Sequence, residues 1–583
     1  MNYELNLSME ELEKRTDKEY LATKKLLTPE SKEYLDLQEG DKKALKYLVK
    51  AGDILEKINM QLDNKENLGF KAFLEEEITK GNRQAELTKI LFDAQKGLCS
   101  LDRESNKIEL AKGIKELPGK GLYPENLTKE EFHSILINML NEGKVEEVRK
   151  ILNQRSVIIR DGEYLKAIDY IDCFKQDFSK MADWLEKAGK VSTNADFNEY
   201  MKLQAEALRK VDPMLDAYAD KKWATLEDTP LEFTITRENY SDEMTETVYE
   251  NEKLKQLLIE NNIEPVSKDF LGARIGIVNK EGTEYLFKIK KYLPLLAYNM
   301  PFKDEYEQNI KPQNTVLAKV KDENSSQTMV DVDLVQVNGD VGAYRAGITL
   351  AENLPNDDKM SLKIGGGRRN VYHRQIRFIS DYTKLQKRLD TLLDKEQHKF
   401  YLNEADHWFT IGHENAHSLG PNKGTEALGK YKSIIEENKA DMASLAMIDI
   451  LRDNGMYTEE QYNQICVTFV ADNFLKSKPT LSQAHRVRSV MQNKYLFDHG
   501  AIELNDEGKI HVNIEKVVPA AKAMLAEIVR IQIDRDFAKG EKYVLDNFVW
   551  TEEMEQIAAK MREIDKNLNG RVEAKLAEKL LSE

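Results

Sequence analysis

The sequence has few cysteines, no long apolar segment and no excess of positive charge, and each absence excludes a class of protein. Its three cysteines, Cys99, Cys173 and Cys466, are widely spaced and odd in number, so they cannot form a disulfide framework. We interpret all three as buried small side chains in a reducing compartment. No apolar run approaches the roughly 20 residues that a membrane-spanning helix needs. The first 20 residues lack the basic and apolar segments of a signal peptide, so we expect a soluble, cytoplasmic protein.

The charge balance narrows the set of partners. The net charge of −16, with a pI near 5.4, argues against a general nucleic-acid binder and against a protein of anionic membrane surfaces. Hydrophobic residues make up 41% and charged residues 32%, which is typical of a globular protein and too apolar for a disordered one. The 583 residues are enough for several domains. The sequence indicates no oligomeric state.

Hydrophobic spacing predicts a mainly α protein with a smaller β-containing core, an α+β fold. Up to about Trp223, and again after Asp381, apolar residues recur at steps of three and four, as in amphipathic helices. Leu231–Thr236 (LEFTIT) alternates apolar and polar residues and is a predicted strand. A second strand-rich stretch begins at Met329, and Asn338-Gly339 within it predicts a hairpin turn.

The residues best suited to metal binding and catalysis are found together in one pentapeptide. His413-Glu414-Asn415-Ala416-His417 is an HExxH pattern. Positions four apart lie on one face of a helix, so the two imidazoles can bind one tetrahedral zinc ion. Glu414 lies beside that face and can take the proton of a zinc-bound water. The pattern predicts a zinc peptidase with Glu414 as its base.

A third ligand follows twenty residues later in a segment of clear helical periodicity. Glu437 and, one turn on, Asp441 form an E-x-x-x-D arrangement similar to that of the gluzincin metallopeptidases. In those enzymes the Glu ligates zinc and the second carboxylate binds the other ring nitrogen of a ligating His, which fixes its orientation. The predicted metal ligands are therefore His413, His417 and Glu437, and one Zn²⁺ would leave its fourth position open.

The helix pair resembles the dipeptidyl peptidase III family of zinc exopeptidases. That family's second motif is EExxA followed by Glu or Asp, and Glu436–Asp441 (EENKAD) matches it. Three further segments resemble the family's motifs in the same chain order, namely Thr236–Asp242 (TRENYSD), Glu352–Asp357 (ENLPND) and Ser482–Arg488 (SQAHRVR). The resemblance implies that Glu436, like Asp441, supports the metal ligands from outside.

The resemblance also implies two lobes separated by a wide substrate cleft, with the zinc on the helical lobe. The lower lobe would comprise residues 1–265 and 332–395, a helical N-terminal part and a β core. The upper, mostly helical catalytic lobe would comprise residues 266–331 and 396–583.

The implied activity is release of dipeptides from the free amino terminus of oligopeptides. Glu238 would accept the substrate ammonium, and Asn353 and Asn356 would hydrogen-bond its backbone in the manner of an added strand. Tyr240 and His485 would donate toward the oxyanion that develops on the scissile carbonyl.

This chain departs from the family in one motif. Most members have HExxGH, with one more residue between Glu and the second His, whereas this chain has the five-residue form. A helix needs no bulge to place this shorter pair on one metal, so we expect zinc binding to be retained.

We interpret Arg368, Arg369, Arg486 and Arg488 as surface cations.

Two other functions remain open. One is a gluzincin aminopeptidase or oligopeptidase of a different cut length, although the upstream G-x-M-E-N segment of such aminopeptidases is absent. The other is a zinc-containing peptide-binding protein without activity, which would have no need of Glu414.

Overall fold

The fold is described from a computed structural model. The described residues are 3–102, 106–114, 117–238, 242–317, 328–342, 350–354, 363–373, 375–378, 382–481 and 483–583. Within them, no helix is both long and apolar enough to cross a lipid bilayer.

The N-terminal part is mostly helical, as the periodicity predicts. Its longest helix, α3 (Glu39–Asp63), packs against α9 (Lys175–Val191), and both bury an apolar stripe. The other helices before the central sheet are α1 (Met9–Thr16), α2 (Lys32–Leu35), α4 (Asn67–Thr79), α5 (Arg83–Gln95), α6 (Lys129–Asn141), α7 (Val145–Ile151), α8 (Tyr170–Cys173), α10 (Ala195–Ala207) and α11 (Pro213–Trp223). Several begin at a polar cap, as where the Thr128 side chain accepts from the backbone N–H of Glu131.

Short strand pairs that the periodicity did not predict interrupt these helices. They are β2 (Cys99–Leu101) with β3 (Lys107–Glu109), and β4 (Ser156–Asp161) with β5 (Tyr164–Asp169). The interpretation of all three cysteines as buried is wrong for two of them. Cys466 is buried, but Cys173 is exposed at the end of a short helix and Cys99 is half-buried in an edge hairpin.

A five-stranded sheet forms the centre of the molecule, in the order β6-β7-β8-β10-β9. The strands are β6 (Leu231–Glu238), β7 (Phe270–Val278), β8 (Thr328–Asn338), β9 (Ala351–Leu354) and β10 (Arg369–Tyr372). Neighbours are antiparallel except β8 and β10, which are parallel. The predicted strand at Leu231 is confirmed.

The hairpin predicted at Asn338-Gly339 stays a prediction, because residues 343–349, where most of its second strand would lie, are outside the described residues. Gly339 takes a positive φ of 94°, a conformation that glycine adopts readily in turns. Strand β8 pairs with β10 over Thr328–Asp331 and with β7 over Val332–Asn338.

Helices α12 (Glu243–Glu246) and α13 (Glu252–Glu260) lie between β6 and β7, and α14 (Lys280–Lys290) and α15 (Leu293–Tyr298) follow β7. After the sheet the chain is helical again, as predicted. These helices are α17 (Gln375–Phe378), α18 (Tyr382–Leu392), α19 (Asn403–Ala416), α20 (Lys432–Ala446), α21 (Ile448–Asp453), α22 (Glu459–Asp472), α23 (Ala484–Asp498), α24 (Ile514–Asp534), α25 (Phe537–Asn547), α26 (Glu552–Ile564) and α27 (Lys575–Ser582). They confirm the α+β class, mainly α with a smaller sheet.

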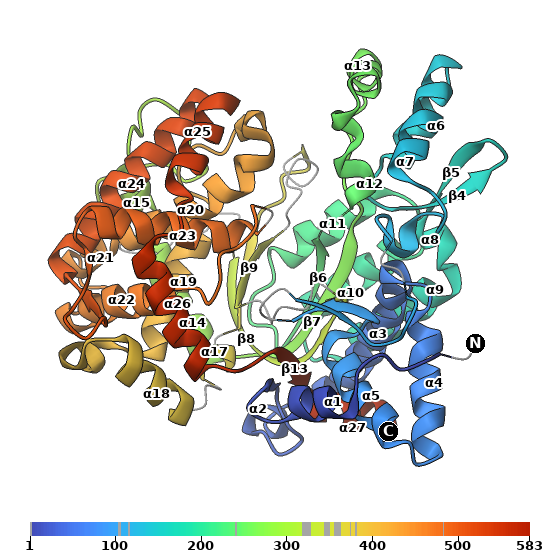
Figure 1. The fold of residues 1–583 in the computed structure, drawn as a ribbon, viewed down its shortest axis with the longest axis horizontal. Coiled ribbons are helices and arrows are strands. Elements are labelled where there is room, and N and C mark those ends of the chain that lie inside the picture. The colour runs from blue at the N-terminus through green and yellow to red at the C-terminus, as the bar shows by residue number, and fades with distance from the viewer. Residues whose placement is uncertain are drawn as a thin grey trace.

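The buried apolar side chains form two separate hydrophobic clusters. The first lies under the N-terminal helices and one face of the sheet, and the second lies among α14, α15 and α18–α26. Figure 1 shows these two groups of elements beside each other, with β8 and β9 where they meet. On β8, Met329 belongs to the second cluster and Val330 to the first, because successive side chains of a strand point to opposite faces.

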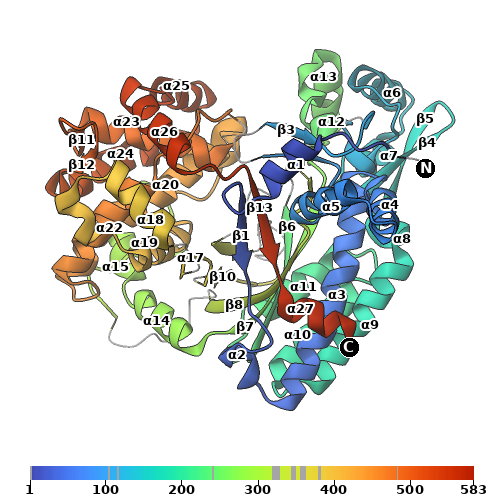
Figure 2. The ribbon, with the colours of Figure 1, turned by 60° about the horizontal axis from the view of Figure 1, so that its bottom comes forward.

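The C-terminal segment returns to the first group. Strand β13 (Asn569–Glu573) pairs in parallel with β1 (Leu21–Lys25), and α27 then buries Leu576 and Leu580 in the first cluster. Figure 2 shows β13 lying along β1 beside the central sheet. The lobe boundaries expected from the sequence stay a prediction; β7 and α27, which it assigned to the zinc-carrying lobe, contribute to the first cluster.

Candidate metal centre

The two helices that carry the sequence motifs pack directly against each other. Helix α19 carries His413 and Glu414 at its C-terminal end and is capped by His417, and α20 carries Glu437. Gly412 lies at their contact, where a Cβ atom would come 2.2 Å from the Ser444 hydroxyl oxygen. The missing side chain therefore lets the helices approach closely enough to bring their ligands together.

We expect Gly412→Ala to lower the free energy of unfolding by about 1–3 kcal/mol, since the added methyl group overpacks this contact. Ser444→Gly in the same chain should recover part of the loss by vacating the space. Chemical denaturation of both variants and of Ser444→Gly alone measures this. An unchanged stability of Gly412→Ala would show that the helices separate without cost.

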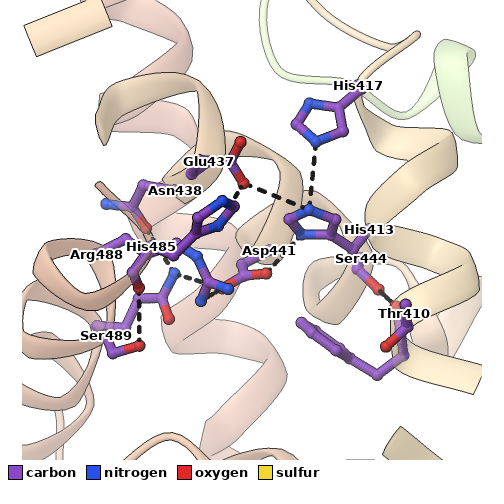
Figure 3. A network of polar contacts seen from close by, with 12 residues as sticks. Thr410, His413, His417, Glu437, Asn438, Asp441, Ser444, His485, Arg488 and Ser489 are labelled. Carbon is purple, nitrogen blue, oxygen red and sulfur yellow. Dashed lines mark hydrogen bonds and ion pairs between the residues drawn. The ribbon is translucent and has the colours of Figure 1, made fainter. Parts of the chain in front are cut away.

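Three donor atoms converge between these helices. The Nε2 atoms of His413 and His417 lie 3.2 Å apart, and Oε2 of Glu437 lies 3.4 Å from Nε2 of His413. Figure 3 shows the two rings and the carboxylate pointing toward one another. Ligands bound at about 2.0–2.1 Å to one tetrahedral zinc ion lie roughly 3.3 Å apart. The residues therefore fit a zinc ion, and they are the one such group of three among the described residues.

The other nitrogen of each ring is held by a carboxylate. Nδ1 of His413 lies 2.7 Å from Oδ1 of Asp441, and Nδ1 of His417 lies 2.9 Å from Oε1 of Glu436. A carboxylate at Nδ1 accepts a hydrogen bond from the ring N–H, which keeps the proton on Nδ1 and leaves the Nε2 lone pair for a metal. Both histidines are thereby oriented for ligation by groups from α20.

The two carboxylates that hold the histidines, Asp441 and Glu436, are each paired with a cationic side chain. Asp441 is paired with Arg488 and accepts from Gln492 at 3.0 Å. Glu436 is paired with Lys439 at 2.8 Å, and the Lys439 side chain is fully buried. The interpretation of Arg488 as a surface cation is wrong, because a buried carboxylate attracts the nearest available guanidinium.

These cations shape the ionisation of the site. Burial opposes ionisation of Glu436, but Lys439 and the hydrogen bond to His417 outweigh it and lower its pKa to about 2. For Asp441, burial is outweighed by Arg488 and by the hydrogen bond to His413, which lower the pKa. Both carboxylates are thus anionic acceptors for their histidines at neutral pH.

We expect Asp441→Ala to weaken zinc binding about 10- to 100-fold, because His413 loses the group that orients it. Titration with a competing chelator measures the affinity. Asp449→Ala, which removes a carboxylate paired with Lys522 outside this site, is the matched control and should bind zinc normally. Equal affinities of the two variants would contradict a supporting role for Asp441.

Glu414, the base predicted from the sequence, directly follows His413 on α19. Its side chain is buried, and burial raises the pKa of its carboxyl group, with His413 and His417 acting in the opposite sense. Among the residues that the structure describes, none makes a hydrogen bond to this carboxylate. It is therefore free to accept a proton next to the converging ligand atoms.

His485 of α23 contacts the same carboxylate oxygen of Glu437 as His413 does. Its Nδ1 atom is 3.2 Å from Oε2 of Glu437, and its side chain is 65% exposed. Figure 3 shows its ring beside the Glu437 carboxylate. The attraction of Glu437 raises the pKa of this imidazole. Its neighbour Arg486, interpreted above as a surface cation, is partly buried and donates to Ser477.

The predicted substrate residues are brought together only in part. Glu238 is the last residue of β6, but its side chain, like all of Tyr240 and Asn356, lies outside the described residues. Asn353 is half-buried on β9, which lies at one end of the sheet order. Arg368 donates to Asn353 at 2.5 Å and so is not a simple surface cation.

The interpretation of Arg369 as a surface cation is also wrong. Arg369 is only 1% exposed and pairs with Glu232 of β6 at 3.1 Å. It also donates to the hydroxyl of Thr328 on the neighbouring strand. The three glycines of residues 365–367, just before the two arginines, show no apolar pattern. Nothing in the local sequence therefore indicates that Arg369 is buried.

A cavity of about 760 Å³ lies beside the sheet. Arg237 of β6 and Leu354 of β9 line it, as do Glu426 and Lys432, which precede and begin α20. The metal ligands do not line it, although Arg237 and Leu354 directly adjoin Glu238 and Asn353. Among the described residues, the cavity lining therefore includes sequence neighbours of two predicted substrate residues and none of the metal ligands.

The fold and the site together define a mainly α protein with a central mixed sheet and an HExxH helix packed on a second ligand-bearing helix. This is the fold of dipeptidyl peptidase III. A structure of that protein from Caldithrix abyssi is similar with a TM-score of 0.77 and 24% identity, over 96% of this chain and 98% of that one. A dipeptidyl-peptidase III structure from Corallococcus sp. strain EGB gives 0.75 and 19%, over 98% of both chains. The resemblance seen in the sequence is confirmed for the fold.

Sequence comparison gives one further relative. Nudix hydrolase 3 of Arabidopsis thaliana is 24% identical over 570 residues, which cover 87% of this chain. The chain spans only 66% of the length of that relative, so a third of it lies outside the match. No protein-family model matches the sequence.

Proposed function

We propose that the protein is a zinc-dependent exopeptidase that releases dipeptides from the free amino terminus of oligopeptides. The observation that supports this most is the convergence of His413, His417 and Glu437, with both ring Nδ1 atoms bound to carboxylates. A purely structural zinc site is closed by four protein ligands, whereas three leave a position for catalysis. A zinc ion held there would act as a Lewis acid toward water and the scissile carbonyl.

Glu414 supplies the proton transfer in this proposal. Its buried carboxylate takes a proton from the attacking water and delivers it to the leaving amine. The raised pKa suits both steps, since it makes the group a stronger base and still lets it give the proton up. His485 and Tyr240 would donate toward the developing oxyanion.

Peptide binding is assigned to the end of the sheet. Asn353 lies on β9, the last strand in the sheet order, and an extended peptide can add to such an edge. Asn353 and Asn356 would hold the peptide backbone, and Glu238 would pair with its terminal ammonium. A carboxylate at a fixed distance from the metal would then set the cut after the second residue.

Two alternatives differ in what they release. A peptidase of the same mechanism with another cut length would produce single residues or internal fragments. A peptide-binding protein would hold zinc and produce nothing. Oligopeptides are the partners in every case, and we propose that the protein acts on them in the cytoplasm.

Incubation with a pentapeptide that has a free amino terminus, and with its N-acetylated form, tests the proposal. Mass spectrometry should show dipeptide release from the free peptide only. Glu414→Ala should abolish the release and keep the zinc, and Glu404→Ala, in the first turn of the same helix, should keep both. Single residues or internal cuts would overturn the dipeptide assignment, and an absence of products from zinc-loaded protein would overturn the peptidase.

A further inference from the structure

A buried chain of hydrogen bonds runs from the metal-carrying helix into the sheet. Its centre is the hydroxyl group of Tyr372 on β10, a side chain with no exposed surface. This hydroxyl accepts from Asn415 Nδ2 at 3.2 Å and from Asn370 Nδ2 at 3.1 Å, and donates to the carbonyl of Ile411 at 3.4 Å. The Asn415 amide also donates to the Ile411 carbonyl at 2.8 Å. Tyr372 therefore joins α19 to β10.

The chain continues to the predicted peptide-binding residue. Asn370 and Asn353 are register partners across the antiparallel pair β10–β9, and the Asn353 amide donates to Oδ1 of Asn370. On its other side Asn353 accepts from Arg368 at 2.5 Å. Both polar atoms of the Asn353 side chain are thus fixed, and its orientation depends on Asn370.

Tyr372 contacts a single face of α19. His407, Ile411 and Asn415 are spaced by four residues and so lie one above another along the helix. The Tyr372 ring meets His407 edge-on at 6.1 Å, and its hydroxyl meets the other two. His413 and Glu414 lie between Ile411 and Asn415 in the same turn of the helix. A shift of the face that contacts Tyr372 would therefore move the metal site with it.

We propose that Tyr372 is a positioning residue that fixes the peptide-binding Asn353 relative to the metal-carrying helix. The inference rests on the proposed peptidase function. Four residues from three elements (α19, β10 and β9) make one continuous link, Asn415, Tyr372, Asn370 and Asn353, and Tyr372 supplies the only hydroxyl in it. Without that hydroxyl the Asn370 side chain loses this bond to Tyr372, and the Asn353 amide that it orients is no longer linked through it to the metal-carrying helix.

Tyr372→Phe tests this, since it keeps the ring and removes the hydroxyl. We expect KM for a free pentapeptide to rise about tenfold, the effect of losing one well-placed hydrogen bond to the peptide, with kcat within about twofold and zinc content unchanged. Asn353→Ala should raise KM to a similar extent. The double variant should be no worse than Asn353→Ala, because both changes remove the same contact.

Tyr495→Phe is the matched control. Tyr495 is buried in the second hydrophobic cluster, and its hydroxyl donates to Glu527 at 2.9 Å, so the change costs stability without touching the link. We expect its melting temperature to fall and its KM to stay unchanged.

The outcomes separate this inference from the function on which it rests. A Tyr372→Phe variant that loses stability but keeps the KM of an active wild type would overturn the positioning role and leave the peptidase standing. Additive effects of Tyr372→Phe and Asn353→Ala on KM would also overturn it. A wild type that cleaves no peptide would overturn both.

Discussion

Replacing Glu414 with glutamine is expected to lower kcat about 10²- to 10⁴-fold, the range that general acid–base catalysis contributes. Glutamine has nearly the same shape, so packing of this buried side chain is preserved, but it cannot accept the proton. The ligands His413, His417 and Glu437 are unaltered, and zinc content should remain at one ion per chain. Steady-state kinetics on a pentapeptide, with metal analysis of the same preparation, measures both.

Two results would contradict this role of Glu414. Activity within a few-fold of wild type would show that another group takes the proton. A loss of zinc together with activity would show that Glu414 supports the metal and is not the base.

The second large effect is expected at a ligand. His417→Ala should weaken zinc binding about 10²- to 10³-fold, because the roughly 10–16 kcal/mol that zinc gains in a protein site is shared among few ligands. This exceeds the loss expected for Asp441→Ala, since a ligand is removed and not only its support. Competition with a chelator gives the affinity, and activity should fall in parallel.

His511→Ala is the control for this change. His511 is half-exposed on β12 (Ile510–Val512) and pairs with Asp394 at 2.8 Å, outside the metal site. It should bind zinc as the wild type does, and chelation followed by added Zn²⁺ should restore its activity. If His417→Ala kept the wild-type affinity, the ion would have to lie elsewhere.

Much of the candidate site could be predicted because its residues are local in sequence. EENKAD lies within one helix, and HENAH ends at the helical C-cap residue of another, so spacing alone decides which of their side chains share a face.

The surroundings of the site could not be predicted in the same way. Arg488 and Arg369 look like surface cations in sequence, and both are ion-paired with carboxylates from distant elements. Tyr372 appears in no motif, yet it joins two residues of α19 to Asn370 of its own strand. Such contacts depend on which elements meet, and no local pattern records that.

The sequence by itself determined the helical character of the chain and which histidine and carboxylate side chains share a helix face, because both follow from the periods of regular backbone structure. Only the tertiary structure decided that the HExxH helix packs on the helix of Glu437, with Gly412 at the contact. It also decided that the His413 and His417 rings are each hydrogen-bonded to a carboxylate, and that each carboxylate is paired with a cation. The physical reason is that Nε2 of His413 and Oε2 of Glu437, 3.4 Å apart, belong to two different helices, and long-range packing alone sets such a distance.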